Sequence, residues 1–291
     1  MNIRKNKLLI SFSGGRTSGY MTHKILSSIS SDVDARVVFA NTGQEDDKTL
    51  EFVHNCELRF GWDITWVEAK VDPKKGKGTR HRITSYETAS RKGEPFEEVI
   101  SKYGIPNQTM PHCTRELKLN PIYSLCKEWK WKKGDYSCAI GIRADEIDRM
   151  SSYAERDNLI YPLVKWGIRK EDVLDWWSKQ NFDLYLPEHR GNCVWCWKKS
   201  YRKLVQVFRD NPESFNFPDR MEKTYGRTGA MAERSGKEQV FFRKHQSTED
   251  VKRMSQEGHI GFEDINFVEE CEESCEVFSD TSLSYSPIKG E

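Results

Sequence analysis

The segment from Ser11 to Ser18 reads Ser-Phe-Ser-Gly-Gly-Arg-Thr-Ser and follows an apolar run. Its two glycines let backbone amides approach an anion, and a helix that begins here adds unpaired N–H groups and the positive end of its dipole. Ser13, Thr17 and Ser18 offer hydroxyl donors, and Arg16 adds charge. The Walker spacing GxxxxGK[ST] is absent, and the alternative is a glycine turn with a Ser/Thr helix cap. Because the segment follows the first predicted strand, we favour phosphate binding.

Eight cysteines are spread along the chain, and Cys193 and Cys196 form the closest pair. Val194 and Trp195 separate them. A CxxC pair is compatible with half of a zinc site, with a redox dithiol, or with part of an iron–sulfur site. Most of the others, at positions 56, 113, 126, 138, 271 and 275, are expected as small core residues.

Composition bounds the class of protein. The chain has 291 residues, 46 Lys and Arg against 45 Asp and Glu, and a formal net charge of +1. It has no apolar run of 18 residues, and the apolar run after the basic N-terminus covers only residues 8–10, too short for the core of a signal peptide. We therefore expect a cytoplasmic protein with no membrane partner, in which the cysteines are not paired as disulfides.

Charge is distributed unevenly, although its sum is close to zero. Residues 73–92 contain seven Lys or Arg and one acid, and residues 190–209 contain six Lys or Arg and no acid. Residues 263–280 contain eight acids and no Lys or Arg. The basic stretches predict contact with a nucleic acid, tRNA or DNA. The alternative for residues 198–203 is a solvated helix face.

The elements that must position these groups follow from the hydrophobic pattern. Strands are predicted at residues 8–12, 35–40 and 63–68, with helices at 17–28 and 47–60 between them. This alternation is typical of an α/β fold with a doubly wound parallel sheet. Ligands bind at the carboxyl edge of such sheets. The glycine segment and the Asn41-Thr42-Gly43 turn are both predicted at that edge.

Further elements are predicted after the third strand, and the whole chain divides into three parts. A loop is predicted at 71–82, helices at 85–103 with a break at Gly93-Glu94-Pro95, and at 115–131, 168–179 and 200–211, and a strand at 136–142. We expect a nucleotide-binding α/β domain at 1–190, a smaller helical, cysteine-containing region at 191–267, and an acidic, disordered tail at 268–291. Trp166, Trp176 and Trp177 are expected to pack in the core.

Five motifs in order resemble one known family. Ser13-Gly14-Gly15-x-x-Ser18 resembles the PP-loop of the ATP pyrophosphatase superfamily, and the chain most resembles its branch of phosphoadenosine phosphosulfate (PAPS) reductases. The other matches are the turn at 39–45, the Cys-to-Pro segment at 113–121, the Gly-Ile-Arg turn at 141–146 and the Pro-Leu-x-x-Trp segment at 161–166. Thr17 stands where many relatives have Asp. Residues 270–275 lack the Gly and His of the reductases' cysteine motif.

The resemblance implies an adenine nucleotide alpha hydrolase-like fold that binds ATP, or a PAPS-like nucleotide, with Mg²⁺. It implies that Arg16 and Arg143 act on the phosphates; an ion pair of Arg143 with Asp145 or Glu146 is the alternative. The nucleotide-binding residues that it implies are Ser11, Ser13, Gly14, Gly15, Arg16, Thr17, Ser18, Asn41, Thr42, Gly43, Gly141, Ile142 and Arg143, with the Asn41 turn holding the adenosine.

The resemblance also implies that Cys113 joins Cys193 and Cys196. In related proteins these positions hold a [4Fe–4S] cluster, and Cys113 would also be catalytic. Only three thiolates are then present, so His112 completes the ligand set or one iron stays open. Zinc and unligated thiols are the alternatives. The positive charge of Arg16 and Arg143, expected near this cluster, should lower the pKa of the thiols.

Three functions follow from these expectations. The first is an ATP-dependent sulfurtransferase that adenylates a substrate, a nucleic-acid base or backbone, and accepts sulfur from a donor protein. The second is a PAPS or adenylyl-sulfate reductase. The third is a non-catalytic nucleotide-binding regulator. The oligomeric state stays open.

Overall fold

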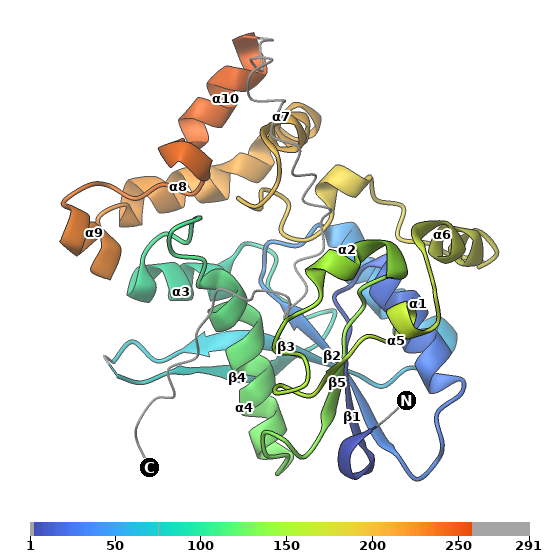
Figure 1. Ribbon diagram of the computed structural model, residues 1–291. Helices are drawn as coiled ribbons and strands as arrows, with labels where there is room; N and C mark the ends of the chain where they lie inside the picture. Colours follow the sequence, from blue (N-terminus) through green and yellow to red (C-terminus); the bar gives the residue numbers. More distant parts are fainter. Residues whose placement is uncertain (1–2, 75, 258–291) are drawn as a thin grey trace.

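The computed structural model describes residues 3–74 and 76–257, and their fold is built on a mostly parallel six-stranded sheet (Figure 1). The strands are β1 (Lys7–Ser11), β2 (Asp34–Asn41), β3 (Ile64–Val71), β4 (Thr79–Thr84), β5 (Ser137–Ala139) and β6 (Leu159–Ile160). Their order is β4-β3-β2-β1-β5-β6, and only the β3–β4 pair is antiparallel. The α/β class predicted from the sequence is confirmed.

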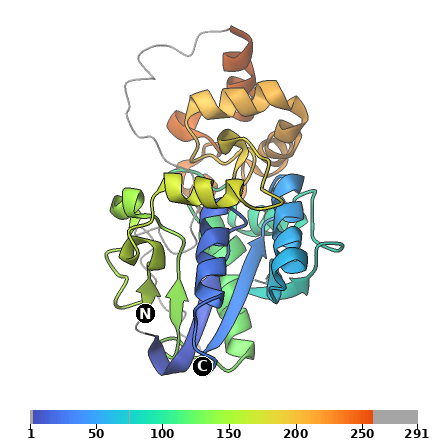
Figure 2. The same cartoon turned by 90° about the vertical axis from the view of Figure 1, so that its right-hand side faces the viewer.

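Alternate residues of each strand point to opposite faces of the sheet, and each face is buried in a core of its own. Leu8 and Ile10 belong to a core that includes residues of α1 (Arg16–Leu26), α2 (Asp47–Phe60) and α6 (Lys170–Ser178). Leu9 belongs to a second core that includes residues of α4 (Asn120–Glu128). Figure 2 shows the helices on the two sides of the strands.

A third core joins the C-terminal helices to the α/β part. It contains residues of α3 (Glu94–Tyr103), α7 (Tyr201–Asp210), α8 (Asn216–Tyr225) and α10 (Thr248–Glu257), with Trp195 and Phe241 between them. Figure 1 shows these C-terminal helices, with α9 (Ala230–Ser235), above the carboxyl end of the sheet. The helical region predicted after residue 190 therefore shares its core with α3.

Short helical elements complete the described chain. They are η1 (Arg4–Asn6), η2 (Arg115–Leu119), η3 (Ala144–Arg149), α5 (Pro162–Lys165), η4 (Glu188–Arg190), η5 (Pro212–Phe215) and η6 (Arg243–His245). No helix among residues 3–74 and 76–257 has the length and apolar character that crossing a membrane requires. The predicted tail at 268–291, with its two cysteines, lies outside the described residues.

Several sequence expectations are wrong in detail. The predicted loop at 71–82 contains the start of β4, an edge strand whose Arg82 pairs with Glu68 and Glu98 of its neighbours. The helix predicted at 85–103 begins only at Glu94, because Gly93 has φ +87° and Pro95 favours a first turn. The helix predicted at 115–131 opens with the π-helical η2.

Candidate functional site

The glycine segment connects β1 to α1 at the carboxyl edge of the sheet. The backbone N–H and the hydroxyl of Ser13 contact the Ser18 hydroxyl at 3.2 and 2.9 Å, and the Ser18 hydroxyl donates to the Gly15 carbonyl at 3.1 Å. These bonds fold the loop back on the first turn of α1. β1 lies between β2 and β5, which is where the strand order changes direction and where ligands bind in α/β sheets.

Glycine stands at the two positions of the loop for different structural reasons. Gly14 has φ +80°, and a Cβ there would lie 2.8 Å from Cγ2 of Thr49 and 3.0 Å from the Phe39 ring. Gly15 has φ −105°, and the nearest atom to its Cβ would be the Ser13 hydroxyl at 3.8 Å. Gly14 is therefore required by packing, whereas the Gly15 position is open toward the cavity that it lines.

Arg16 is held in a bidentate ion pair with Asp183. Its Nε and a terminal nitrogen lie 2.7 and 2.8 Å from the two Asp183 oxygens. Trp177 donates from its indole nitrogen to the Arg16 carbonyl at 2.8 Å and is itself almost fully buried. Core packing is confirmed for Trp177, and Trp166 and Trp176 pack against the same core. Arg16 is thus anchored before any ligand binds.

Arg143 follows the end of β5 and reaches the glycine segment at residues 11–18, which we call the phosphate loop after its predicted role. One terminal nitrogen donates to the Thr17 hydroxyl at 3.2 Å, and its guanidinium also pairs with Asp145 and Glu146. Partial burial of Asp145 opposes ionisation, but its hydrogen bonds with Arg143 and with backbone N–H groups, together with the charge of Arg143, outweigh this and lower its pKa. The ion pair and the contact with the loop therefore coexist.

Gly141 allows this approach of β5 to the loop. A Cβ at Gly141 would lie 3.1 Å from Cα of Ser18. Ile142 and Ser11 were also predicted at the nucleotide, but the Ile142 side chain is fully buried in the core behind the sheet, and Ser11 is buried in β1. Neither residue lines the cavity described next.

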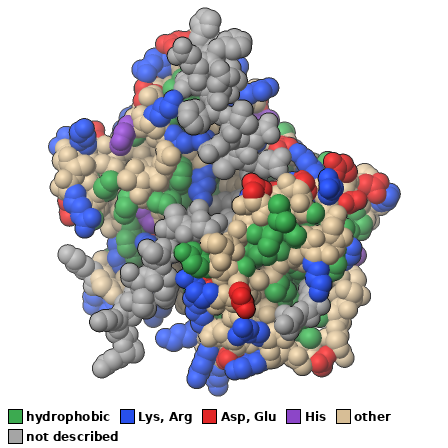
Figure 3. Space-filling view, viewed as in Figure 1, with side chains coloured by type: hydrophobic (Ala, Val, Ile, Leu, Met, Phe, Trp, Pro, Cys, Tyr) green, Lys and Arg blue, Asp and Glu red, His purple; other side chains and the backbone are tan. Residues whose placement is uncertain are grey.

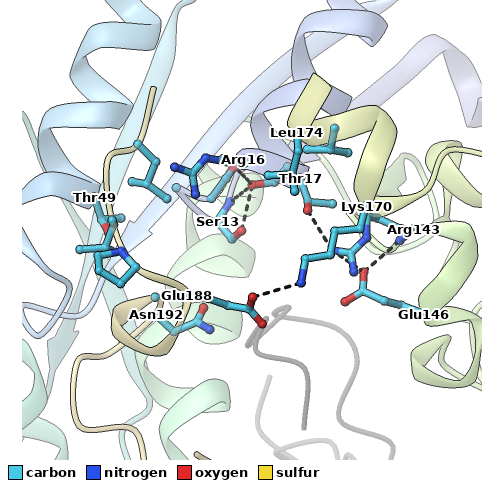
Figure 4. Close-up of a pocket in the computed structure, with 18 residues that line it drawn as sticks. Ser13, Arg16, Thr17, Thr49, Arg143, Glu146, Lys170, Leu174, Glu188 and Asn192 are labelled. Atoms are coloured by element: carbon cyan, nitrogen blue, oxygen red, sulfur yellow. Dashed lines mark hydrogen bonds and ion pairs between the residues drawn. The ribbon is translucent and has the colours of Figure 1, made fainter. Parts of the chain in front are cut away.

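A cavity of about 230 Å³ lies in front of the phosphate loop (Figure 4). Its polar side is formed by the loop with Thr49, Arg143, Glu146, Lys170, Glu188 and Asn192, and its apolar side by Val173, Leu174, Leu184, Leu186 and Pro187. Lys170 pairs with Glu188 across it at 3.0 Å. Glycine amides, two cations and an apolar wall are features that an adenine nucleotide would use.

The Asn41-Thr42-Gly43 turn lies elsewhere than predicted relative to this cavity. Asn41 donates to Glu68 at 2.7 Å, and Thr42 donates from its N–H and hydroxyl to Glu45. The Thr42 hydroxyl lies 3.4 Å from the sulfur of Cys193. The turn thus contacts the CxxC segment, and its residues do not line the cavity of the phosphate loop.

Cys113, Cys193 and Cys196 line a second, smaller cavity. Its other walls are Thr42, Phe96, Thr114, Leu117, Lys118, Trp195, Trp197 and Lys198. η2 carries Lys118, and the CxxC turn is held against the start of α2 by a backbone bond from Val194 to Gln44 of 3.0 Å. The three predicted cysteines are therefore brought to one place although 80 residues separate Cys113 from Cys193.

Two consecutive residues of the chain line the two cavities. Asn192 lines the first and Cys193 lines the second. The segment that leads to them is tied down at Asp183 by Arg16 and at Arg190 by Asp46, the residue that caps α2. One segment of the chain thus contributes residues to both cavities.

Zinc and an iron–sulfur cluster, the two metal centres considered from the sequence, place different requirements on the positions of the three thiols. Among residues 3–74 and 76–257, no three His, Cys, Asp or Glu side chains stand as ligands of one metal ion. Zinc would need its sulfurs at about 2.3 Å from one centre. In an iron–sulfur cluster each thiolate binds a different iron, so its thiols need not converge on one atom. The three thiols line one cavity together with Lys118 and Lys198.

His112 does not join this cavity. It is buried, both of its ring nitrogens lack a hydrogen-bond partner in the structure, and burial lowers its pKa to about 4. Its nearest ring is that of Tyr103, at 5.9 Å. The expectation that His112 completes the ligand set gains no support from its position.

The thiol pKa expectation is wrong for Cys193. Burial raises the pKa of this thiol well above its usual value, and the Glu45 carboxylate adds to the shift, while Lys118 opposes it. The expected Arg16 and Arg143 line the other cavity. Binding to a cation would therefore be needed to hold Cys193 as a thiolate. The six described cysteines form no disulfide with one another.

The basic stretches are partly used inside the molecule. Lys199 is buried and donates to the carbonyls of His189 and Gly191, and Arg190 pairs with Asp46. Figure 3 shows Lys and Arg over both the helical and the sheet parts of one face, with acidic side chains among them. Fewer cations face solvent than the sequence counts suggest.

Sequence reasoning missed Lys170, Asp183, Glu188 and Lys118. Each is an ordinary surface charge by sequence, and only the tertiary fold brings it to the site. A signal existed for Lys118, which belongs to the segment with Cys113 that resembles the family. No comparable signal marks Asp183, because nothing near it in sequence indicates a partner 167 residues away.

Known proteins resemble this chain over most of its length. The nin region protein ORF290 of Escherichia phage lambda is 31% identical over 283 residues, covering 93% of this chain and 94% of that protein. Two Methanocaldococcus jannaschii proteins, MJ0066 and MJ0973, are each 25% identical and cover 74% and 71% of this chain, but only 36% and 45% of their own length. The three names assign no activity. No known family model matches the chain.

Proposed function

The chain belongs to the family of the nin region protein ORF290 of Escherichia phage lambda, and we propose that it is an ATP-dependent sulfurtransferase of the PP-loop class. The observation that carries the proposal is that consecutive residues, Asn192 and Cys193, line two cavities, one at a glycine loop and one at three cysteines. We further propose that the sheet is doubly wound and that the fold is adenine nucleotide alpha hydrolase-like. The reducing cytoplasm suits its thiols.

In this proposal ATP, with Mg²⁺, occupies the first cavity. Amides of the loop and the cations Arg143 and Lys170 surround the phosphates. A substrate oxygen attacks the α-phosphorus, the bond to the oxygen bridging to the β-phosphate breaks, and pyrophosphate leaves. Arg143 takes up the charge that develops on the leaving group. Arg16 supports the loop through its pair with Asp183.

Sulfur transfer follows at the second cavity. A carbon–sulfur bond forms as the carbon–oxygen bond to AMP breaks, and a sulfur-donor protein supplies the sulfur as sulfide. Cys113, Cys193 and Cys196 would hold a [4Fe–4S] cluster, with zinc as the alternative. When bound, a cluster with three cysteine ligands leaves one iron open to carry sulfur.

The test is product analysis with the anaerobically purified protein. Wild type, Cys196→Ala and Cys56→Ala are incubated with ATP, sulfide and RNA or DNA, and pyrophosphate, AMP and sulfur-labelled nucleic acid are measured. We expect all three products from wild type and from Cys56→Ala, whose thiol lies in the core of α2. Cys196→Ala should form no sulfur-labelled product.

Two outcomes would replace the proposal. Release of sulfite from PAPS or adenylyl sulfate, with no pyrophosphate from ATP, would indicate a sulfonucleotide reductase. Tight nucleotide binding without any turnover would indicate a regulator. Equal sulfur transfer by Cys196→Ala and wild type would contradict the role of the thiol cavity.

A further inference from the structure

A third hollow, of about 420 Å³, lies on the other side of the CxxC turn. Its back wall is Val194 and Trp195, the two residues between Cys193 and Cys196, together with Gln44 and Glu45. Trp195 lines both this hollow and the thiol cavity. A ligand in the hollow would therefore be one side chain away from the thiols. Neither the phosphate loop nor Arg143 lines it.

The rim of the hollow is cationic. Arg91 and Lys92 stand on one side and Arg220 of α8 on the other. Lys92 is exposed and makes no hydrogen bond or ion pair with any residue in the described ranges 3–74 and 76–257. The Arg220 side chain is 51% exposed although it pairs with Glu97. These cations come from segments far apart in sequence.

The acids of the hollow do not neutralise this rim. Glu45 is buried and is turned inward, because it accepts from the N–H and the hydroxyl of Thr42. Glu213 is the other acid among the residues that line it, and it is exposed. Arg91 pairs with Asp47 at 3.4 Å and donates to the carbonyls of Tyr86 and Ala89, and Arg220 pairs with Glu97, so Lys92 is the rim cation that has no partner among the described residues.

The inner wall is aromatic and rigid. The rings of Phe96, Trp195 and Phe217 stack on one another, with centroids 5.3, 5.7 and 5.9 Å apart. The guanidinium of Arg220 lies 5.4 Å from the centroid of Phe217, which lines the hollow. Trp195 and Phe217 are buried, so the planar group that a base in the hollow can stack on is the guanidinium of Arg220, which lies over Phe217.

We propose that this hollow anchors one unpaired nucleotide of a single-stranded nucleic acid, the sulfur acceptor. The inference rests on the proposed function for the acceptor's chemistry, but the hollow itself is separate from the nucleotide cavity. Lys92 and Arg220 contact the phosphates on either side of the anchored nucleotide, and its base stacks on the guanidinium of Arg220. In a duplex the bases are paired and stacked inside the helix, so a duplex offers no free base to the hollow and binds poorly.

The test is fluorescence anisotropy with a labelled oligonucleotide of about 12 nucleotides, as RNA and as DNA, single-stranded and in duplex form. Lys92→Glu and Arg220→Glu should each weaken single-strand binding about tenfold and lower the salt dependence by about one ion. The matched control is Lys237→Glu, an exposed lysine that lines none of the three cavities. Glu213→Gln should strengthen binding about threefold by removing the exposed acid.

Equal losses in Lys92→Glu and Lys237→Glu would overturn the inference, because they would indicate unspecific attraction. Equal affinity for duplex and single strand, or no binding at low salt, would also overturn it. A polyglutamate peptide that competes as well as the strand does would indicate an acidic protein partner instead. ATP binding by the same variants separates the two proposals: a wild type that binds the strand but no ATP contradicts only the proposed function.

Discussion

Single residues decide what each part of the site tolerates. Gly14 and Gly15 are adjacent and look equivalent in the sequence, yet only Gly14 has a left-handed backbone and a crowded Cβ position. The sequence predicted that both glycines serve the approach of a ligand. The structure shows a packing requirement for glycine at Gly14 and none at Gly15.

Gly14→Ala should therefore lower the stability of the protein. The left-handed backbone and the contact with Thr49 together cost roughly 2 to 4 kcal/mol of unfolding free energy. Gly15→Ala should change it by less than about 0.5 kcal/mol. Urea unfolding of both variants measures this, and equal stability of the two would contradict the assignment.

His23 provides a test by pH. It packs against the rings of Phe60, Trp62 and Trp176, and burial lowers its pKa. The unfolded chain then takes up a proton at a higher pH than the folded one, so stability falls as pH drops from about 6.5 toward the folded pKa. His23→Phe should lose less stability over this range than wild type. An identical pH dependence in both proteins would contradict the account.

At the scale of elements, the segment between α6 and α7 connects the two cavities. Asp183 pairs with Arg16, Arg190 pairs with Asp46, and Cys193 contacts Thr42. Each of these contacts joins a loop to the end of a helix or strand at the carboxyl edge of the sheet. The loop is thereby positioned by α1, α2 and β2 together.

Asp46→Ala should affect both α2 and this segment. Its carboxylate accepts from the Lys48 N–H at 3.0 Å as the helix cap and also pairs with Arg190. Loss of the cap costs about 1 kcal/mol, and loss of the ion pair adds to it. The control is Ser200→Ala, which removes the cap of α7 without an ion pair. A smaller effect at Asp46 than at Ser200 would contradict this role.

Elements with strong periodicity could be predicted from the sequence, and those defined by tertiary contact could not. The range of α2 was predicted to the residue from the helical spacing of Leu50, Val53 and Leu58, and in the structure Asp46 and Gly61 mark its ends. β4 was missed because Thr-Arg-His-Arg-Ile-Thr shows no apolar alternation, and as an edge strand it needs none. The three cysteines were grouped correctly only through the family resemblance, whereas Asp183 and Lys170 carry no local signal.

On the scale of the whole molecule, three cores hold the sheet and the C-terminal helices as neighbours. Trp195 belongs to the core shared with α3 and also forms the wall between thiols and hollow. Consecutive residues, Asn192 and Cys193, line the cavity of the phosphate loop and the thiol cavity, and Trp195 lines both the thiol cavity and the cationic hollow. A loss in one of them need not disturb the folding of the others.

Metal analysis tests whether the thiol cavity holds a metal centre. Anaerobically purified wild type and Cys56→Ala should contain iron and acid-labile sulfide with the visible absorption of a cluster, and Cys113→Ala and Cys196→Ala should not. The two substituted cysteines come from the segment just before η2 and from the CxxC turn, so both losses are needed to support a shared centre. Zinc without iron in wild type would keep the shared site but contradict the cluster.

The central claim is that the loop at Ser13–Ser18 binds ATP, and calorimetric titration of Gly15→Val tests it most directly. The nearest atom to a Cβ at Gly15 would be 3.8 Å away, so the valine should leave the melting temperature within about 2 °C of wild type while its side chain enters the cavity. Wild type should bind one ATP, and Gly15→Val should bind it at least about 100-fold more weakly. Unchanged ATP affinity in a folded Gly15→Val protein would contradict the account.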